Sequence, residues 1–388
     1  MRQLMNREIK AELLEICEQL IALPSMNPPG REAAVIDYLE AYCTEAGLRC
    51  HRLPCGLEKG RENLLALLPG QESGQGLLFT GHSDVVPVPE EERKKWLTDP
   101  FRPALHEGRL YGRGACDMKS GLAAVALALA ELGRQGWRPR RDLGLLVTVD
   151  EEDGMQGSRS LQDSPLLRPF RSLIVAEPTG LKLCSRSRGR TYGILHCLGQ
   201  TAHGSRPEAG CNALLLAHEL LKGLLRLDFS TYNNADGESQ LRPLGIHAQA
   251  DPWVIPDRCS LRLDARLTTG HDPADIWERI TGLTAELEAK YTGRARFYHE
   301  VLDSRESWRS ADCWLLRRCK EVLQERGLPT EEQCFTGTTD GTPLRRSGMD
   351  VIILGPGDLS LAHQANESVD LGEVQLAYEI YRNLMREN

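Results

Sequence analysis

The apolar and polar positions of this chain follow two periods, one typical of helices and one typical of buried strands. Between Ile9 and Leu20 apolar residues recur at helical spacing, and the NPPG turn at 27–30 ends that helix. A second helical pattern runs through residues 35–42. The chain therefore begins with two amphipathic helices.

Short apolar runs with the length of buried strands follow these helices. They lie at 77–80, 143–149, 173–176 and 351–354. Between the first two runs the segment MKSGLAAVALALAEL predicts a helix rich in Ala and Leu. Strands that alternate with helices in this way predict an α/β sheet with helices on its faces.

The length of 388 residues suits two domains better than one compact core. The stretch between the third and fourth strand-like runs is far longer than one crossover connection needs. Within it, YGILHCLGQTAHG, a helix at 213–225 and CSLRLDARL indicate a small α/β sandwich. We expect an inserted domain at 183–296, between the first part (1–182) and the second part (297–388) of a catalytic domain.

Composition narrows the class of protein. A net charge of −8 argues against a nucleic-acid partner, and no apolar run approaches the ~20 residues needed to span a membrane. The charged N-terminal segment lacks the pattern of a signal peptide. The 12 cysteines include no C-x-x-C pair, so we expect reduced thiols and a cytoplasmic location.

Five residues of metal-ligand type lie where the predicted strands end. His82 follows one strand in LLFTGH, Glu152 another in LLVTVDEE, and Glu177 a third in LIVAEP. The carboxyl ends of such strands meet at one edge of a sheet. Asp117 lies in the glycine-rich turn GRGACD, and His363 follows GPG. Two His and three carboxylates suit two zinc-like ions with one carboxylate bridging them.

Each of these residues alone also has a local explanation. Asp117 could cap the Ala-rich helix, and the acidic run 150–153 could be a solvated loop. A lone histidine such as His363 is more often structural than a ligand. Their joint occurrence at strand ends favours a metal site, where Glu151 stands beside one ligand as a candidate general base.

The motifs GHSDVVP, GRGACDMK, DEE, EPTG and AHQANE, in this order, resemble those of the M20 metallopeptidase family. The resemblance implies a zinc-peptidase-like catalytic domain, with a mixed sheet flanked by helices, and an inserted smaller α/β sandwich as a lid. It also implies two metal sites. His82 and Glu177 would bind one ion, Glu152 and His363 the other, and Asp117 would bridge both.

The same resemblance implies further roles. Asp84 would orient His82, and Glu151 would be the general base. The segment AHGSRPEAGCNA is similar to a lid motif whose histidine, here His203, reaches the active site of a partner subunit. We therefore expect a homodimer formed through the lid, with His203 stabilising the oxyanion. Arg266 in LDARL would meet a substrate carboxylate, for which its forked guanidinium is suited.

Other positions bear on the substrate. Gly341, in GTTDG, resembles a substrate-contacting loop of desuccinylases. Trp253, in DPWVIPD, stands where the family usually carries Asn, which predicts a more apolar pocket. The basic segment 185–190, SRSRGR, would either attract an anionic substrate or form a solvated strand edge.

These features predict a hydrolase that cleaves the amide bond of an N-acyl amino acid, of N-acetyl or N-succinyl type, with water activated between two divalent metal ions. Zinc is the expected metal, and cobalt or manganese accept similar ligands. A dipeptidase or carboxypeptidase acting on a short peptide is the alternative. A non-catalytic metal-binding protein is disfavoured because Glu151 and the five ligand positions are all intact.

Overall fold

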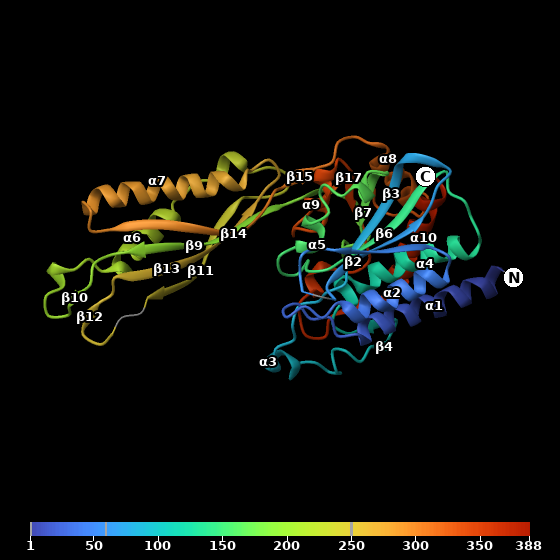
Figure 1. The fold of residues 1–388 in the computed structure, drawn as a ribbon, viewed down its shortest axis with the longest axis horizontal. Coiled ribbons are helices and arrows are strands. Elements are labelled where there is room, and N and C mark those ends of the chain that lie inside the picture. Colours follow the sequence, from blue (N-terminus) through green and yellow to red (C-terminus); the bar gives the residue numbers. More distant parts are fainter. Residues whose placement is uncertain (1, 59, 249–250) are drawn as a thin grey trace. The chain divides into compact units, whose positions relative to one another are not determined.

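The computed structural model describes residues 2–58, 60–248 and 251–388, which divide into two compact units (Figure 1). The large unit contains the chain up to Arg186 together with Ser310–Phe335 and Thr339–Asn388. The inserted unit contains Ser187–Arg309 and Thr336–Thr338. Each unit has its own buried apolar core.

A mixed sheet forms the centre of the large unit, as the sequence predicted. Strand β3 is parallel to its neighbours β6 and β7, and β17 is parallel to β7, whereas β2 runs antiparallel to β6. The strands follow one another across the sheet in the order β1 (Arg49–Pro54), β2 (Glu62–Leu68), β6 (Arg141–Thr148), β3 (Glu72–His82), β7 (Phe170–Val175), β17 (Asp350–Ile353), β8 (Cys184–Ser187) and β15 (Trp308–Arg309), and β16 (Gln333–Phe335) also pairs with β8.

Helices cover this sheet. The central one, α4, is buried on nearly all sides because its many alanines let neighbouring elements approach, and it packs against α1 and α10. The helices of the unit are α1 (Arg2–Ala22), α2 (Ala33–Glu45), α3 (Glu90–Arg93), α4 (Ser120–Arg134), α5 (Gln156–Arg159), α8 (Trp314–Gln324), α9 (Gly341–Leu344) and α10 (Leu371–Arg386). A small sheet adds β4 (Ala104–His106), β5 (Arg109–Tyr111) and β18 (Ser368–Asp370).

The inserted unit is a four-stranded antiparallel sheet with helices on one face (Figure 1). Along β9 buried residues alternate with partly exposed ones, which is the pattern of a sheet with one covered face. Its strands lie in the order β11 (Gln240–Ala248), β13 (Arg258–Leu267), β9 (Gly189–Leu198) and β14 (Arg296–Arg305), and its helices are α6 (Ala213–Leu224) and α7 (Pro273–Tyr291). Two short strands, β10 (Ala202–His203) and β12 (Val254–Ile255), pair with each other in the same unit.

The inserted unit extends further along the chain than the predicted range 183–296. Strand β14 begins at Arg296, where the sequence suggested a return to the first domain, yet it pairs with β9 over its whole length. The alternating pattern of this segment identifies a strand but does not reveal which sheet it joins. Separately, in the described part of the chain every helix is too short or too polar to cross a membrane.

Candidate metal centre

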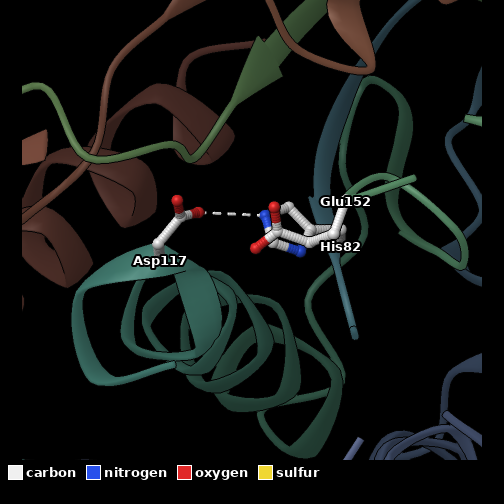
Figure 2. A group of neighbouring side chains, drawn as sticks. All are labelled: His82, Asp117 and Glu152. Atoms are coloured by element: carbon white, nitrogen blue, oxygen red, sulfur yellow. Dashed lines mark hydrogen bonds and ion pairs between the residues drawn. The ribbon is translucent and has the colours of Figure 1, made fainter. Parts of the chain in front are cut away.

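The five predicted ligands come together in the large unit. His82 is the last residue of β3, and Glu152 and Glu177 follow the ends of β6 and β7. Asp117 lies in the turn that leads into α4, and His363 follows β17 and a short helical turn. Because the parallel strands end at the same edge, their carboxylates and imidazoles converge there. Figure 2 shows His82, Asp117 and Glu152 facing one another.

Asp117 lies between two histidine–carboxylate pairs. Its Oδ1 is 3.0 Å from His82 Nε2, and that nitrogen is 3.7 Å from Glu177 Oε1. Its Oδ2 is 3.2 Å from His363 Nε2, which is 3.1 Å from Glu152 Oε1. One carboxylate thus presents a separate oxygen to each pair, which is the geometry required of a ligand shared by two ions.

The orientation of His82 is fixed by the main chain. Its Nδ1 lies 3.0 Å from the carbonyl oxygen of Asp84, so in the neutral ring Nδ1 carries the proton and Nε2 keeps its lone pair toward Asp117. The Asp84 carboxylate is 3.6 Å from the same nitrogen. It accepts instead from the amides of Glu151 (3.2 Å) and Glu152 (3.0 Å). Asp84 therefore contacts the predicted base and one ligand as well as His82.

The electrostatics of this cluster favour a bound cation. Burial and the nearby Asp117 carboxylate raise the pKa of Glu177 well above its usual value, and burial also raises that of Glu152. Burial lowers the pKa of His363, but hydrogen bonds to Asp117 and Glu152 outweigh it and raise this pKa to about 11. Crowded carboxylates of this kind are stabilised by positive charge.

The donor atoms also fit a metal. His82, Asp117 and Glu152 each offer one ligand atom, and these three atoms all lie within 4.8 Å of one another. Imidazole nitrogens with carboxylate oxygens are a donor set typical of zinc and of similar divalent ions. The side chains are buried except that of His363, which is 49% exposed. The cluster is thus accessible to solvent on the His363 side.

Glu367 holds the turn that carries Asp117, a role that sequence reasoning missed. Its Oε1 accepts from the amides of Gly114 (3.0 Å), Cys116 (2.9 Å) and Asp117 (3.0 Å). Its Oε2 accepts from Arg113 at 2.7 Å. Glu367 is the last residue of the AHQANE motif, so the sequence drew attention to this segment. An acidic residue after a turn does not, however, indicate that three backbone amides of a distant loop will donate to it.

Asp340 performs a similar task for the end of β6. Its buried carboxylate accepts from the hydroxyls of Thr148, at 2.5 Å, and Ser158. The adjacent Gly341 is buried, and a Cβ built there would lie 2.9 Å from a methyl carbon of Val175. Gly341 is therefore a close-packing position in this structure, and its predicted contact with substrate stays a prediction.

In the inserted unit, His203 lies at the end of β10. Its Nδ1 accepts from the Ser205 amide at 3.1 Å, which places the proton of the neutral ring on Nε2. Trp253 lies beside this turn, because its carbonyl oxygen accepts from the amide of Gly204. Trp253 as a residue is 83% exposed, and its φ is +71°, a left-handed conformation.

Arg266 is fixed by a carboxylate on its own strand. Asp264 accepts from Arg266 Nε at 2.8 Å and from Arg190 Nε at 2.7 Å, and it is buried. The two arginines stand directly opposite each other on β13 and β9, so their side chains share one face of the sheet. One acid therefore aligns two guanidinium groups side by side.

Comparisons with known proteins assign the chain to a family. A model of the peptidase family M20/M25/M40 matches residues 78–387. The chain belongs to this family, whose members are metal-dependent hydrolases of amide and peptide bonds.

Relatives and solved structures extend the likeness over nearly the whole chain. An acetylornithine deacetylase of Proteus mirabilis is 30% identical over 385 residues, covering 96% of this chain and 95% of that protein. A tripeptidase of Staphylococcus aureus shares the fold with a TM-score of 0.80 at 19% identity, covering 97% of this chain and 98% of that one. Human carnosine dipeptidase 1 also shares the fold, with a TM-score of 0.74 at 16% identity, covering 100% of this chain and 99% of that one.

Proposed function

We propose that this protein is an amidohydrolase that removes the acyl group of an N-acyl amino acid, of N-acetyl or N-succinyl type. The observation that carries the proposal is the position of Asp117 between two histidine–carboxylate pairs. The likeness to an acetylornithine deacetylase over nearly the full length supports a deacylase rather than another hydrolase of this family.

Two divalent metal ions fit the cluster. His82 and Glu177 would hold one, Glu152 and His363 the other, and Asp117 both, as the interatomic distances allow. When bound, such ions polarise a substrate carbonyl and lower the pKa of water toward neutrality. Zinc is proposed as the metal, with cobalt or manganese as substitutes that accept the same ligands.

Glu151 is proposed to move the proton. Its side chain is buried next to the ligand Glu152, and its amide is anchored on Asp84 at 3.2 Å. A carboxylate in this position takes a proton from the attacking water and returns it to the leaving amine. The amide carbon gains the hydroxyl and the nitrogen gains the proton, so the products are a carboxylate and a free amine.

Residues of the inserted unit are proposed to select the substrate. The Nε2–H of His203 is suited to donate to an oxyanion, and the guanidinium of Arg266 to a carboxylate. Trp253 would offer an apolar surface. We further propose a homodimer, in which His203 serves the partner's site, because the edge strands of the inserted sheet expose apolar residues such as Ile246 and Leu302.

A dipeptidase is the second candidate. It is favoured by one observation, the exposed Trp253 at a position where the family usually has Asn, since an apolar surface suits a peptide side chain better than a small polar group. Both candidates use the same ligands and base, so only the leaving amine and the acyl group differ.

The test is a hydrolysis screen of N-acetyl and N-succinyl amino acids and dipeptides, with zinc restored after chelation. The proposal predicts zinc-dependent release of free amino acid from N-acyl substrates at a kcat/KM above that for any dipeptide. Preference for dipeptides would favour the second candidate, and no zinc-dependent hydrolysis of either class would overturn both.

A further inference from the structure

A turn far from the predicted ligands in sequence reaches the centre of the site. The NPPG turn at 27–30 is tied to the chain just after β3, because the Asn27 amide donates to the Val85 carbonyl at 2.9 Å and the Val85 amide to Ser25 at 3.0 Å. This pairing brings the Asn27 side chain next to Asp84. Its Nδ2 donates to Asp84 Oδ2 at 2.9 Å and to Asp150 Oδ1 at 3.0 Å.

Asp84 and Asp150 in turn position the loop that carries the proposed base. Both amides at Glu151 and Glu152 donate to the Asp84 carboxylate, which has no exposed area. Asp150 adopts a left-handed φ of +68°, and its Oδ2 accepts from the Gln156 amide at 3.1 Å. The turn at 150–156 is thus closed by the Asp150 side chain and held in place by the Asp84 side chain.

Arg61 is the cation that joins these groups. Its Nη2 donates to Asp150 Oδ1 at 2.9 Å, to Glu32 Oε1 at 2.7 Å and to Asn27 Oδ1 at 3.2 Å, and its Nε donates to Glu32 at 3.0 Å. The Arg61 side chain is 12% exposed and that of Glu32 is fully buried. A Cβ built on Gly30 would lie 2.2 Å from Arg61 Cζ, so the glycine of the turn leaves room for the guanidinium.

The charges explain why an arginine is needed here. Three carboxylates are buried here: those of Asp84 and Asp150 accept from Asn27, and that of Glu32 accepts from Arg61. Buried carboxylates require positive partners, and a fork with several donors satisfies more than one acceptor at once. A lysine carries the same charge, but its ammonium group lacks the fixed, planar arrangement of N–H donors that matches these three acceptor groups.

We propose that Arg61 is a positioning residue of the active site, which sets the place of Glu151 and Glu152 through Asp150, Asn27 and Asp84. Its hydrogen bonds go to Glu32, Asn27 and Asp150, none of which is a proposed metal ligand or the proposed base. The inference rests on the proposed function in so far as Glu151 is the base. The NPPG turn, which the sequence indicated only as the end of a helix, and Arg61, which the sequence did not single out, are then both part of the catalytic framework.

The experiment compares Arg61→Ala with the wild-type full-length protein, zinc-loaded in both cases. We expect kcat for an N-acyl amino acid to fall about 10- to 100-fold, the range typical of partners behind metal ligands, with KM changed little. Amide hydrogen exchange should rise in peptides covering 149–156 and stay near wild-type in peptides of the inserted unit. Added guanidinium ion should restore part of kcat, because it can occupy the space left by the side chain.

Arg52→Ala is the matched control, since Arg52 pairs with Asp37 and Glu40 on the surface of the same unit and should leave kcat unchanged. Should Arg61→Ala fold poorly, Arg61→Lys keeps the charge and should show the same local exchange with a smaller loss of kcat. Wild-type kcat and wild-type exchange at 149–156 in either variant would overturn the proposal, as would exchange that rises equally throughout the large unit. If the wild-type protein cleaves no N-acyl amino acid, the proposed function fails while the exchange measurement still decides the role of Arg61.

Discussion

The candidate metal centre and the candidate substrate residues differ in how firmly the protein holds their side chains. At the centre, His82 and Asp117 are buried, and the ring of His82 contacts protein groups through both nitrogens. In the inserted unit, the His203 ring is hydrogen-bonded to Ser205, two residues further along the chain, and Trp253 is 83% exposed. Buried hydrogen bonds thus hold the side chains of the candidate metal centre in place, whereas these two side chains of the inserted unit are free to adapt to a substrate.

Metal and proton chemistry requires fixed interatomic distances, and buried hydrogen bonds to distant segments provide them. Exposed side chains on short strands contribute little to the core, so substitution there alters binding without cost to the fold. Changes at the centre should therefore abolish turnover of every substrate. Changes in the inserted unit should alter turnover or preference while the metal content stays constant.

The largest expected effect is that of Glu151→Gln. Removing the proposed base should lower kcat by about 10²- to 10⁴-fold, because proton transfer from a positioned group contributes that much. Bound zinc, measured by elemental analysis, should equal the wild-type content. Asp153→Asn is the matched control, since Asp153 is an exposed acid of the same run. Near-normal kcat in Glu151→Gln would assign the base to another residue.

The second-largest effect is expected for His203→Ala. Losing one hydrogen-bond donor to the oxyanion should lower kcat about 10²- to 10³-fold. His218→Ala, an exposed histidine on α6, serves as the control. Mixing His203→Ala with Glu151→Gln should restore part of the activity if each site uses a histidine from the partner subunit. A mixture no more active than its parents would show that His203 acts within its own subunit or not at all.

Arg266→Met should mainly raise KM. Losing a charge-assisted hydrogen bond to a substrate carboxylate should lower kcat/KM by about 10- to 100-fold. Arg262→Met, an exposed arginine on the same strand, is the control. The loss should disappear for an amide substrate whose carboxylate is blocked. An equal loss for blocked and free substrates would remove Arg266 from carboxylate recognition.

The smallest change is expected for Trp253→Asn. Asn tolerates a left-handed φ better than most residues, so the variant should fold at least as well as the wild type. We expect a shift of a few-fold, about 2- to 5-fold, in kcat/KM toward substrates with small polar acyl groups, since one apolar contact contributes little to discrimination. Unchanged relative kcat/KM values across the substrate panel would show that Trp253 does not contact substrate.

The sequence predicted that the side chains of the candidate metal centre come together, because their convergence follows from the order and direction of the strands, while their roles as metal ligands stay a prediction. His82, Glu152 and Glu177 follow apolar strands, and parallel strands bring their carboxyl ends to one edge. Asp117 and His363 could be predicted as ligands only with the order of the motifs as well, since the sequence around each also has a local explanation. The buried strands and the Ala-rich helix could also be predicted from the sequence, because charged residues are absent from the strand runs and rare in the helix.

The supporting residues could not be predicted in the same way. Asn27, Glu367 and Asp340 are polar residues in or near turns, where local capping explains them equally well. Their partners lie 57, 250 and 192 residues away at Asp84, Asp117 and Thr148, and only the folded chain brings these together. The end of the inserted unit was missed for the same reason, because β14 reveals its sheet only by pairing with β9.

The most direct test of the account is the zinc content of the protein after chelation and reconstitution, in the wild type and in Asp117→Ala. Since Asp117 offers one oxygen to each histidine–carboxylate pair, the wild type should bind two ions per chain and Asp117→Ala fewer than one. A wild type that binds a single ion, or an Asp117→Ala variant that still binds two, would contradict the shared-carboxylate centre.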